Sequence, residues 1–590
     1  MQDFIFGTLA DDAARIKHLR RLWQGVTHDQ TRSPLAPAPG QPVEIELTLG
    51  PGQPFDRAWV YWSTDGLDPL GSGGEARHGY ATPMQAVDTM WNVVEWGYQR
   101  RFRATIPGQP EGTLVRYYLS ATAPGKGEQL ADGGKYYAWY VTDTPPPEWS
   151  RSAVIYQIFV DRFYPGEGKK WLTPANLTGF YGGTLRGVTE KLDYIRELGA
   201  NALWLTPIFP SPSHHGYDAT DLFSIEPRLG DKEDLRVLLD SAHQRGMRVL
   251  LDFVPNHWSY LHSTFQDAIT NPSSPYVDWY TFRRYPDEYA SFFGVKTLPE
   301  INLRHPAARQ HVLEAAAYWL EFGVDGYRVD YAIGPTPDFW ADFRRVTLNT
   351  RPDCWTFGEV VEPSDSQRKF TGLLNGCLDF MLLEAIRQTF VFHEWSTSQF
   401  MSFLDRHEAY FPVEFSRPSF LDNHDMNRFL WAAGGDKLAL KLAALCQFSL
   451  SGPPVIYYGT EVGLSQARDV RQDGRGLPEE SRAPMLWGED QDLDLLAFYR
   501  QLIALRLREP ALQLGSRHSL AAPDGVIAYE RQYAGRSLGI VLNLSPDPCT
   551  ARLKGDWNSI ALNTSPDCRI EPLDGEVHIE LLPKSGMILV

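Results

Sequence analysis

Short apolar runs alternate with longer amphipathic segments along the middle of the chain. The runs ALWL (202–205), RVLLDFV (248–254) and GYRVD (326–330) are typical of parallel strands that are buried on both faces of a sheet. Segments with helical spacing of apolar residues, such as residues 233–246, follow them. From Ala153 onward this order of strand, loop and helix repeats and predicts an eight-stranded β/α barrel. The predicted strands lie at residues 153–160, 202–205, 248–254, 326–330, 354–360, 378–383, 418–425 and 453–459.

The segments on either side of the barrel predict β-sandwiches. Residues 42–143 contain strand-like runs separated by Gly, Pro and Asp, which is typical of a sandwich of immunoglobulin size. Helical spacing in residues 11–25 predicts a helix before it, and strand-like runs after Ala511 predict a smaller sandwich. We therefore expect three domains, at residues 1–147, 148–510 and 511–590, with an insertion over the barrel mouth at about 257–299.

The charge balance of the chain argues against a nucleic acid or an anionic membrane as its binding partner. The chain has 56 basic and 73 acidic side chains and a net charge of −17, so it lacks the basic surface that a nucleic acid or an anionic membrane requires. A neutral substrate is expected. The five cysteines are odd in number and widely spaced, and the first residues do not resemble a secretion signal. No stretch of eighteen apolar residues occurs, so a soluble, cytoplasmic protein is expected.

Three carboxylates fall at the ends of predicted barrel strands, where the chemistry of such barrels takes place. They are Asp330 in GYRVD, Glu359 in FGEV and Asp425 in FLDNHD. Paired carboxylates suit glycosidic bond hydrolysis, in which one attacks the sugar and the other protonates the leaving oxygen. Arg328 lies two residues before Asp330 on the same strand face, and its charge is expected to keep Asp330 ionised.

The order of short motifs supports a family resemblance. DFVPNH, GYRVD, FGEV and FLDNHD occur in sequence, together with LPEIN, YQIFVDRF and GPPVIYYGTE. With these motifs the chain resembles the α-amylase family, glycoside hydrolase family 13, over roughly residues 150–590. It is most similar to the group of cyclomaltodextrinases, neopullulanases and maltogenic amylases. The resemblance implies a (β/α)8 barrel with an N-terminal sandwich similar to a carbohydrate-binding module.

The resemblance also implies a reaction. It is the hydrolysis, with retention, of α-1,4 glucosidic bonds in maltodextrins or cyclodextrins through a covalent glycosyl-enzyme intermediate, with α-1,6 bonds left open as a second bond type. In that reaction Asp330 is the nucleophile, Glu359 the acid/base, and Asp425 a carboxylate that grips sugar hydroxyls.

By the same resemblance, further residues bind the glucose unit at the cleavage point. His257 and His424 match histidines that hydrogen-bond this unit, and Tyr217 matches the ring stacked beneath it. Asp218 is expected to orient its hydroxyls or to pair with an arginine. Arg328 completes the set of residues assigned to substrate binding.

The sequence departs from the group at two places, which change what is expected of transfer to acceptor sugars and of calcium binding. Gly334 replaces a glutamate that handles acceptor sugars, which favours water over a sugar as acceptor. The loop YPGEGKK brings Lys169 and Lys170 to a place where relatives often bind calcium, so no cofactor is expected to be required and no metal ligand is assigned.

Alternatives remain open at this point. A transferase or isomerase can use the same scaffold, because the covalent intermediate can pass to a sugar. A non-catalytic carbohydrate-binding scaffold is a third reading. The related enzymes dimerise through the N-terminal domain, so a homodimer is expected, with a neutral α-glucan oligosaccharide as substrate and no nucleic acid or membrane partner.

Overall fold

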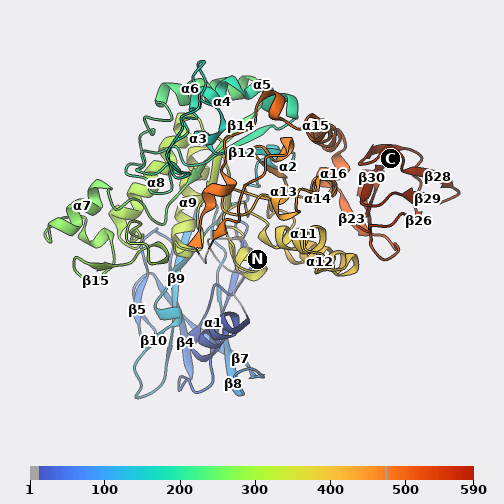
Figure 1. Cartoon of the computed structure of the whole chain (residues 1–590). Coiled ribbons are helices and arrows are strands. Elements are labelled where there is room, and N and C mark those ends of the chain that lie inside the picture. The colour runs from blue at the N-terminus through green and yellow to red at the C-terminus, as the bar shows by residue number, and fades with distance from the viewer. Residues whose placement is uncertain (1–11, 473–474) are drawn as a thin grey trace.

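Parallel strands form a barrel at the centre of the molecule (Figure 1). The computed structural model describes residues 12–472 and 475–590 of the chain. The regular barrel strands are β12 (Ile155–Ile158), β13 (Ala202–Leu205), β14 (Arg248–Phe253), β17 (Gly326–Val329), β18 (Trp355–Gly358), β19 (Gly376–Cys377) and β20 (Val455–Tyr457). They pair in the order β19-β18-β17-β14-β13-β12-β20.

The remaining position of the barrel is filled by a less regular segment. Single parallel bridges join Gly376 to Ser416 and Ser419 to Pro454, so the chain between Ser416 and Ser419 lies between β19 and β20 and closes the ring. The (β/α)8 fold is therefore confirmed. The predicted strand at 418–425 forms only this bridge and not a regular ladder.

Helices cover the outside of the barrel, and several of them begin at a capping side chain. The Asp231 side chain accepts a hydrogen bond from the Asp234 N–H, and Asp234 accepts one from the Asp231 N–H, which forms a capping box. The main helices are α4 (Leu185–Glu190), α5 (Leu192–Leu198), α6 (Lys232–Gln244), α8 (Pro306–Phe322), α9 (Pro337–Thr350), α10 (Ser364–Arg368), α11 (Phe380–Phe390), α12 (Thr397–Tyr410), α14 (Lys437–Ser449) and α15 (Leu493–Arg508).

The prediction of a strand at residues 378–383 is wrong. β19 ends at Cys377, and the apolar run instead begins the helix α11. The Asp379 side chain accepts a hydrogen bond from the Leu382 N–H and thereby caps this helix. A short apolar run has no periodicity that separates a buried strand from a buried helix.

Two antiparallel sheets form the expected N-terminal sandwich. The strand β7 belongs to both sheets, because it pairs with β8 in one and with β4 in the other. It was not predicted, since most of its residues are exposed and do not alternate with apolar ones. The main elements are α1 (Asp12–Gln24), β3 (Val43–Leu49), β4 (Arg57–Ser63), β7 (Tyr80–Asn92), β8 (Gly97–Ile106), β9 (Leu114–Thr122) and β11 (Tyr137–Tyr140). Asp11, the first residue of the predicted helix, lies outside the described residues.

Buried ion pairs attach this sandwich to the barrel. Arg116 of β9 contacts both Asp338 and Asp342 of α9, and the Arg309 guanidinium of α8 lies 2.8 Å from Asp342. Arg304 bridges Asp338 and Asp68. Removing one partner of a buried pair leaves an uncompensated charge at a cost of about 3–5 kcal/mol. The sandwich is therefore part of the same stable unit as the barrel.

The insertion and the C-terminal sandwich complete the expected architecture. The insertion lies between β14 and α8 and contains α7 (Ser263–Thr270) and the hairpin of β15 (Phe282–Arg284) and β16 (Glu288–Tyr289). The C-terminal sheets pair in the orders β23-β24-β25-β30-β27 and β26-β29-β28. Their strands are β23 (Ser516–Ser519), β24 (Val526–Tyr533), β25 (Arg536–Asn543), β26 (Cys549–Lys554), β27 (Ile560–Asn563), β28 (Arg569–Leu573), β29 (Glu576–Leu581) and β30 (Ser585–Leu589). Among the described residues, no helix is both long enough and apolar enough to cross a lipid bilayer.

Candidate active site

One fully buried guanidinium holds three carboxylates together at the carboxyl end of the barrel strands. Arg328 of β17 places Nη1 2.6 Å from Asp252 Oδ1 and 2.9 Å from Asp330 Oδ1, and places Nη2 2.7 Å from Glu359 Oε1. Asp330 follows β17 and Glu359 follows β18, its neighbour in the sheet. The two predicted catalytic carboxylates are thus anchored on the two ends of one rigid planar group.

The backbone after Asp330 also reaches Glu359. The Tyr331 N–H donates a hydrogen bond of 3.2 Å to Glu359 Oε2. Tyr331 adopts a φ of +41°, in the left-handed region that a bulky residue rarely occupies. This turn redirects the chain at the end of the strand and orients the amide toward the carboxylate.

A second network fixes His424 and Tyr217. The Gln157 amide donates to His424 Nδ1 at 2.9 Å, which places the proton of the neutral ring on Nε2. That N–H lies 2.6 Å from the Tyr217 hydroxyl, and the Tyr217 hydroxyl in turn donates to Asp252 Oδ2 at 2.9 Å. The two rings are stacked, with centroids 5.3 Å apart. Burial and the nearby cations Arg482 and Arg328 lower the pKa of His424 well below its usual value.

Asp425 has a cationic partner that the sequence did not reveal. Arg482 Nη2 lies 2.9 Å from Asp425 Oδ1, and its Nε donates to the His424 carbonyl at 2.7 Å. Arg482 comes from the long segment after β20, outside all the motifs used for prediction. His424 Nε2 lies 3.1 Å from Asp425 Oδ2, so Asp425 joins the same network.

Burial and mutual repulsion raise the pKa values of Asp330 and Asp425. Burial raises the pKa of Asp330 well above its usual value, Arg328 opposes this, and Glu359 adds to it. This departs from the expectation that the charge of Arg328 keeps Asp330 ionised. Burial likewise raises the pKa of Asp425 to about 7, although Arg482 acts to lower it. The surplus of carboxylates over guanidiniums therefore opposes full ionisation of Asp330 and Asp425.

His257 and Asp218 lie at the edge of this arrangement. His257 is buried, its ring stacks on Phe292 of the insertion at 4.3 Å, and burial lowers its pKa to about 3. Asp218 accepts hydrogen bonds from the Ser211 hydroxyl at 2.5 Å and from the Ser213 hydroxyl. Their contacts with a sugar remain predictions.

The position of Gly334 has a steric explanation. A Cβ at Gly334 would lie 2.1 Å from the Asn256 side-chain oxygen and 2.9 Å from the Tyr331 ring, so a larger residue does not fit without rearrangement. Two aromatic side chains near Gly334 could stack on an acceptor sugar, Trp340 and Tyr331. Trp340 is buried and donates to the Ala332 carbonyl, so it offers no stacking surface. Tyr331 is half-buried and packs against Phe293, an exposed residue of the insertion.

The loop considered for calcium does not fit a cation. Its single acidic residue, Glu167, pairs with Lys169 at 2.6 Å. Across the part of the chain that the structure describes, no group of three or more His, Cys, Asp or Glu side chains is arranged to hold a metal ion.

Replacing Arg482 with glutamine should shift the pH dependence of the reaction. Arg482 lowers the pKa of Asp425, so its loss should raise that pKa further above about 7. If Asp425 must be ionised to act, activity will be lost as the pH falls through the higher pKa, and the acidic limb of the kcat/KM profile will move upward by about one unit. Arg500→Gln, on an exposed arginine, is the control. An unchanged acidic limb would show that Asp425 does not set it.

Comparison with known proteins agrees with this geometry. The model of the family described as alpha amylase, catalytic domain, matches residues 157–495. Over 483 residues the chain is 38% identical to Alpha-amylase 2 of Dictyoglomus thermophilum, covering 82% of this chain and 84% of that protein. It is 33% identical to Neopullulanase 2 of Thermoactinomyces vulgaris, covering 75% and 78%. A solved cyclomaltodextrinase structure superposes with a TM-score of 0.69 at 26% identity, over 96% of this chain and all of that one.

Proposed function

The chain belongs to the α-amylase family of glycoside hydrolases, and we propose that it hydrolyses α-1,4-glucosidic bonds of maltodextrins or cyclodextrins with retention. Similarity to a neopullulanase adds α-1,6 bonds as a second substrate class to be tested. The observation that carries the proposal is the shared Arg328 guanidinium, which holds Asp330 and Glu359 in contact range of one sugar. Incubation with maltotriose and with β-cyclodextrin, followed by chromatography of the products, tests it.

The carboxylates divide the reaction between them. An Asp330 oxygen attacks the anomeric carbon, and the glycosidic carbon–oxygen bond breaks while Glu359 gives its proton to the departing oxygen. Glu359 then takes a proton from water, whose oxygen attacks the same carbon and releases Asp330. The first step requires a proton on Glu359 and an ionised Asp330.

The neighbouring groups position the sugar and stabilise the charge that develops on it. Asp425 carries negative charge beside the forming oxocarbenium ion, and Arg482 holds that carboxylate in place. The Tyr217 ring, stacked on His424, offers a flat surface. A non-catalytic scaffold has no need of this connected arrangement.

Hydrolysis is expected to exceed transfer to a second sugar. Gly334 offers no side chain to hold an acceptor, and Asn256 and Tyr331 occupy the space beside it. With millimolar maltotriose, glucose and maltose should therefore outweigh longer products by at least about fivefold, because an acceptor without a fixed position gains little effective concentration over water. Tyr331→Ala should lower the residual transfer further. Transfer products in excess would favour the transferase alternative.

We also propose a reducing, cytoplasmic location. All five cysteines are unpaired, which suits a compartment in which thiols stay reduced.

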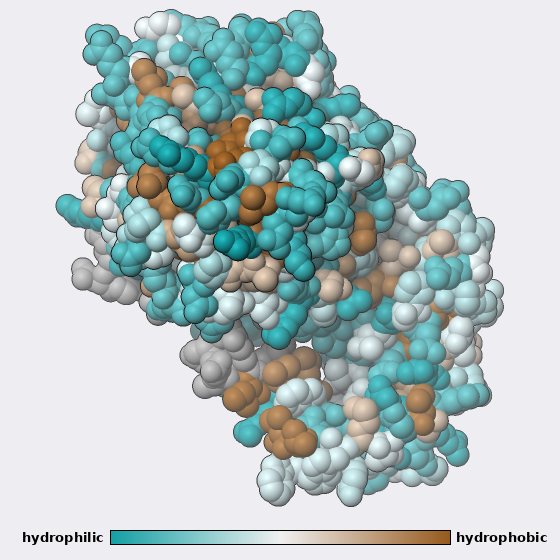
Figure 2. Space-filling view, turned by 90° about the vertical axis from the view of Figure 1, so that its right-hand side faces the viewer, coloured by the Kyte–Doolittle hydropathy of each residue, from teal (hydrophilic) through white to brown (hydrophobic). Residues whose placement is uncertain are grey.

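A homodimer through the N-terminal sandwich is proposed on the basis of an exposed apolar patch. Val93 and Trp96, in the turn between β7 and β8, are 71% and 82% exposed, and Ile16 and Leu19 of α1 are also exposed. The Arg20 and Gln24 side chains both contact Glu95 in that turn, so α1 and the turn form one surface. Figure 2 shows apolar atoms gathered at the lower end of the molecule, which the sandwich forms in Figure 1. A patch of this kind marks an association surface.

A double variant, Val93→Glu with Trp96→Glu, should convert a dimer into a monomer in sedimentation velocity at micromolar concentration, because it places charges in the buried contact. Activity on starch relative to cyclodextrin should then rise, if the sandwich of one subunit narrows the cleft of the other. Val413→Glu adds a charge at a fully exposed apolar residue elsewhere and is the control. A monomeric unmodified protein would contradict the proposal. Deletion of the sandwich is a poorer test, since it strips Asp338 and Asp342 of Arg116.

A further inference from the structure

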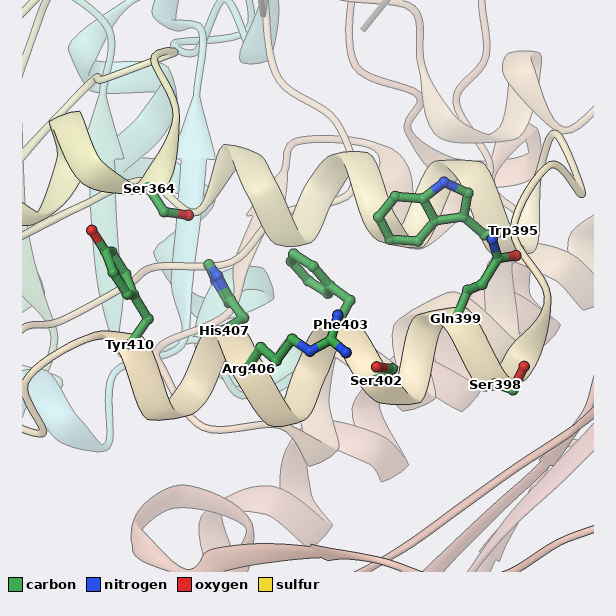
Figure 3. A pocket seen from close by; sticks show the side chains of 9 residues that line it. All are labelled: Ser364, Trp395, Ser398, Gln399, Ser402, Phe403, Arg406, His407 and Tyr410. Atoms are coloured by element: carbon green, nitrogen blue, oxygen red, sulfur yellow. The ribbon is translucent and has the colours of Figure 1, made fainter. Parts of the chain in front are cut away.

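A groove distinct from the carboxylate cluster runs along α12 on the outside of the barrel (Figure 3). Its lining residues, which define the α12 groove, are Ser364, Trp395, Ser398, Gln399, Ser402, Phe403, Arg406, His407 and Tyr410. Those on α12 recur every three or four residues and so share one face of the helix. From Ser398 to Tyr410 this face is about 18 Å long. Asp330, Glu359 and Asp425 are not among the residues that line the α12 groove.

Aromatic rings line the floor of the groove, where Trp395, Phe403 and Tyr410 are partly exposed and His407 between them is buried. Figure 3 shows Trp395, Phe403, His407 and Tyr410 in succession from one end to the other. Phe403 and His407 are stacked with centroids 4.8 Å apart, and Trp395 meets Phe403 edge-on at 5.7 Å. Trp395 and Phe403 pack against the core and remain only partly buried, so each leaves part of its surface to the groove.

Contacts beneath the floor hold these rings in place before any ligand arrives. His407 Nε2 lies 2.9 Å from the buried Asp379 carboxylate, which also caps α11. At the surface, the Arg368 guanidinium of α10 lies 4.8 Å from the centre of the Tyr410 ring. Rings that are already fixed lose little entropy when a ligand stacks on them.

The rim is polar and contains no carboxylate. It supplies the hydroxyls of Ser364, Ser398 and Ser402, the Gln399 amide and the Arg406 guanidinium. A cationic ligand finds no counter-charge here, and an apolar helix would cover Ser364, Ser402 and Arg406 without pairing their polar groups. A polyanion requires more than one cation. Neutral ligands with many hydroxyl groups and apolar C–H faces match both floor and rim.

We propose that the α12 groove is a second glucan-binding site, which holds a linear maltooligosaccharide without cleaving it. The choice of ligand class rests on the proposed function, whereas the site itself rests on the groove. Sugar rings stack on the aromatic floor, and their hydroxyls bond to the rim. With no carboxyl group in its lining, the groove has no nucleophile for the bond and no acid to protonate a leaving oxygen. The site would keep a long glucan on the enzyme while the barrel acts on another part of the chain.

Calorimetry with maltoheptaose tests this in full-length protein carrying Asp330→Asn, which prevents cleavage. We expect two binding events per chain. Adding Phe403→Ala should remove one of them or weaken it at least tenfold. Because that change removes a packed ring, Ser402→Glu is the second variant, since it fills the groove from the helix surface without touching the core. Phe392→Ala, at an exposed aromatic residue outside the groove, should leave both events unchanged.

The same substitutions in the active protein separate the two sites. Ser402→Glu should leave hydrolysis of a short chromogenic maltoside within twofold and should reduce retardation in a gel that contains starch. A single binding event in the Asp330→Asn protein, or a second event that both groove variants leave intact, would overturn the proposal. Loss of self-association by the Ser402→Glu variant in sedimentation velocity would also overturn the proposal, because it would show that the groove is a contact between two copies of the chain. Absence of glucan hydrolysis with two binding events would refute the proposed function alone.

Discussion

Asp330→Ala is expected to lower kcat on maltotriose by about four orders of magnitude or more, because without the carboxylate no glycosyl ester forms. Added azide should restore part of the rate by entering the space left beside Arg328, whose guanidinium attracts an anion. The azide attacks from the side that Asp330 occupied, so the product should be a β-glycosyl azide.

Asp330→Asn is the matched control for this result. The amide removes the nucleophile but fills the same volume, so azide should not rescue it. Recovery of an α-glycosyl azide, or a rate near that of the unmodified protein, would remove Asp330 from the nucleophile role.

Glu359→Gln should have an effect that depends on the leaving group. Cleavage of maltotriose should fall by about 10³-fold, since its leaving oxygen needs a proton. An α-maltosyl fluoride carries a leaving group that does not need one, so the first step should remain within about tenfold. A burst of one fluoride per enzyme should appear, followed by slow turnover, because Glu359 is also the base for the second step.

Glu362→Gln, on the same loop, serves as the control and should leave both substrates nearly unaffected. An equal loss on the fluoride and on maltotriose in the Glu359 variant would assign Glu359 a structural role.

The barrel and its principal acids could be predicted from the sequence because local signals specify them. Buried parallel strands are continuous apolar runs, and ALWL at 202–205 coincides with β13. Asp330 and Glu359 follow such runs directly, so their position at the barrel mouth required only the order of strands. The contact of Arg328 with Asp330 followed from the two-residue repeat of a strand.

The features that the sequence did not predict depend mainly on contacts that form only in the folded chain. Arg482 reaches Asp425 from 57 residues further along the chain and lies in no motif, so only the folded arrangement identifies it. The close approach of Asn256 to Gly334 is likewise visible only in the folded structure. The sequence showed only that an acceptor-binding glutamate is absent, whereas the structure shows that Asn256 leaves no room for a side chain at this position. The prediction of a strand at 378–383 is wrong because the Asp379 side chain caps a helix at this point, which the apolar pattern does not reveal.

The pKa of Asp330 could not be predicted from its neighbour in sequence. Arg328 was known, but the degree of burial and the approach of Glu359, Asp252 and Asp425 outweigh it. These groups come from separate barrel strands and loops, and their sum is available only from the assembled site.

The most direct measurement is the identification of the residue that becomes glycosylated. The Glu359→Gln protein, treated with α-maltosyl fluoride, quenched in acid and digested, can be mapped by tandem mass spectrometry. The account predicts a maltosyl mass on the peptide that contains Asp330, located on that residue. A label on the peptide of Asp425 or of residue 359, or a fluoride burst with no labelled peptide, would contradict it.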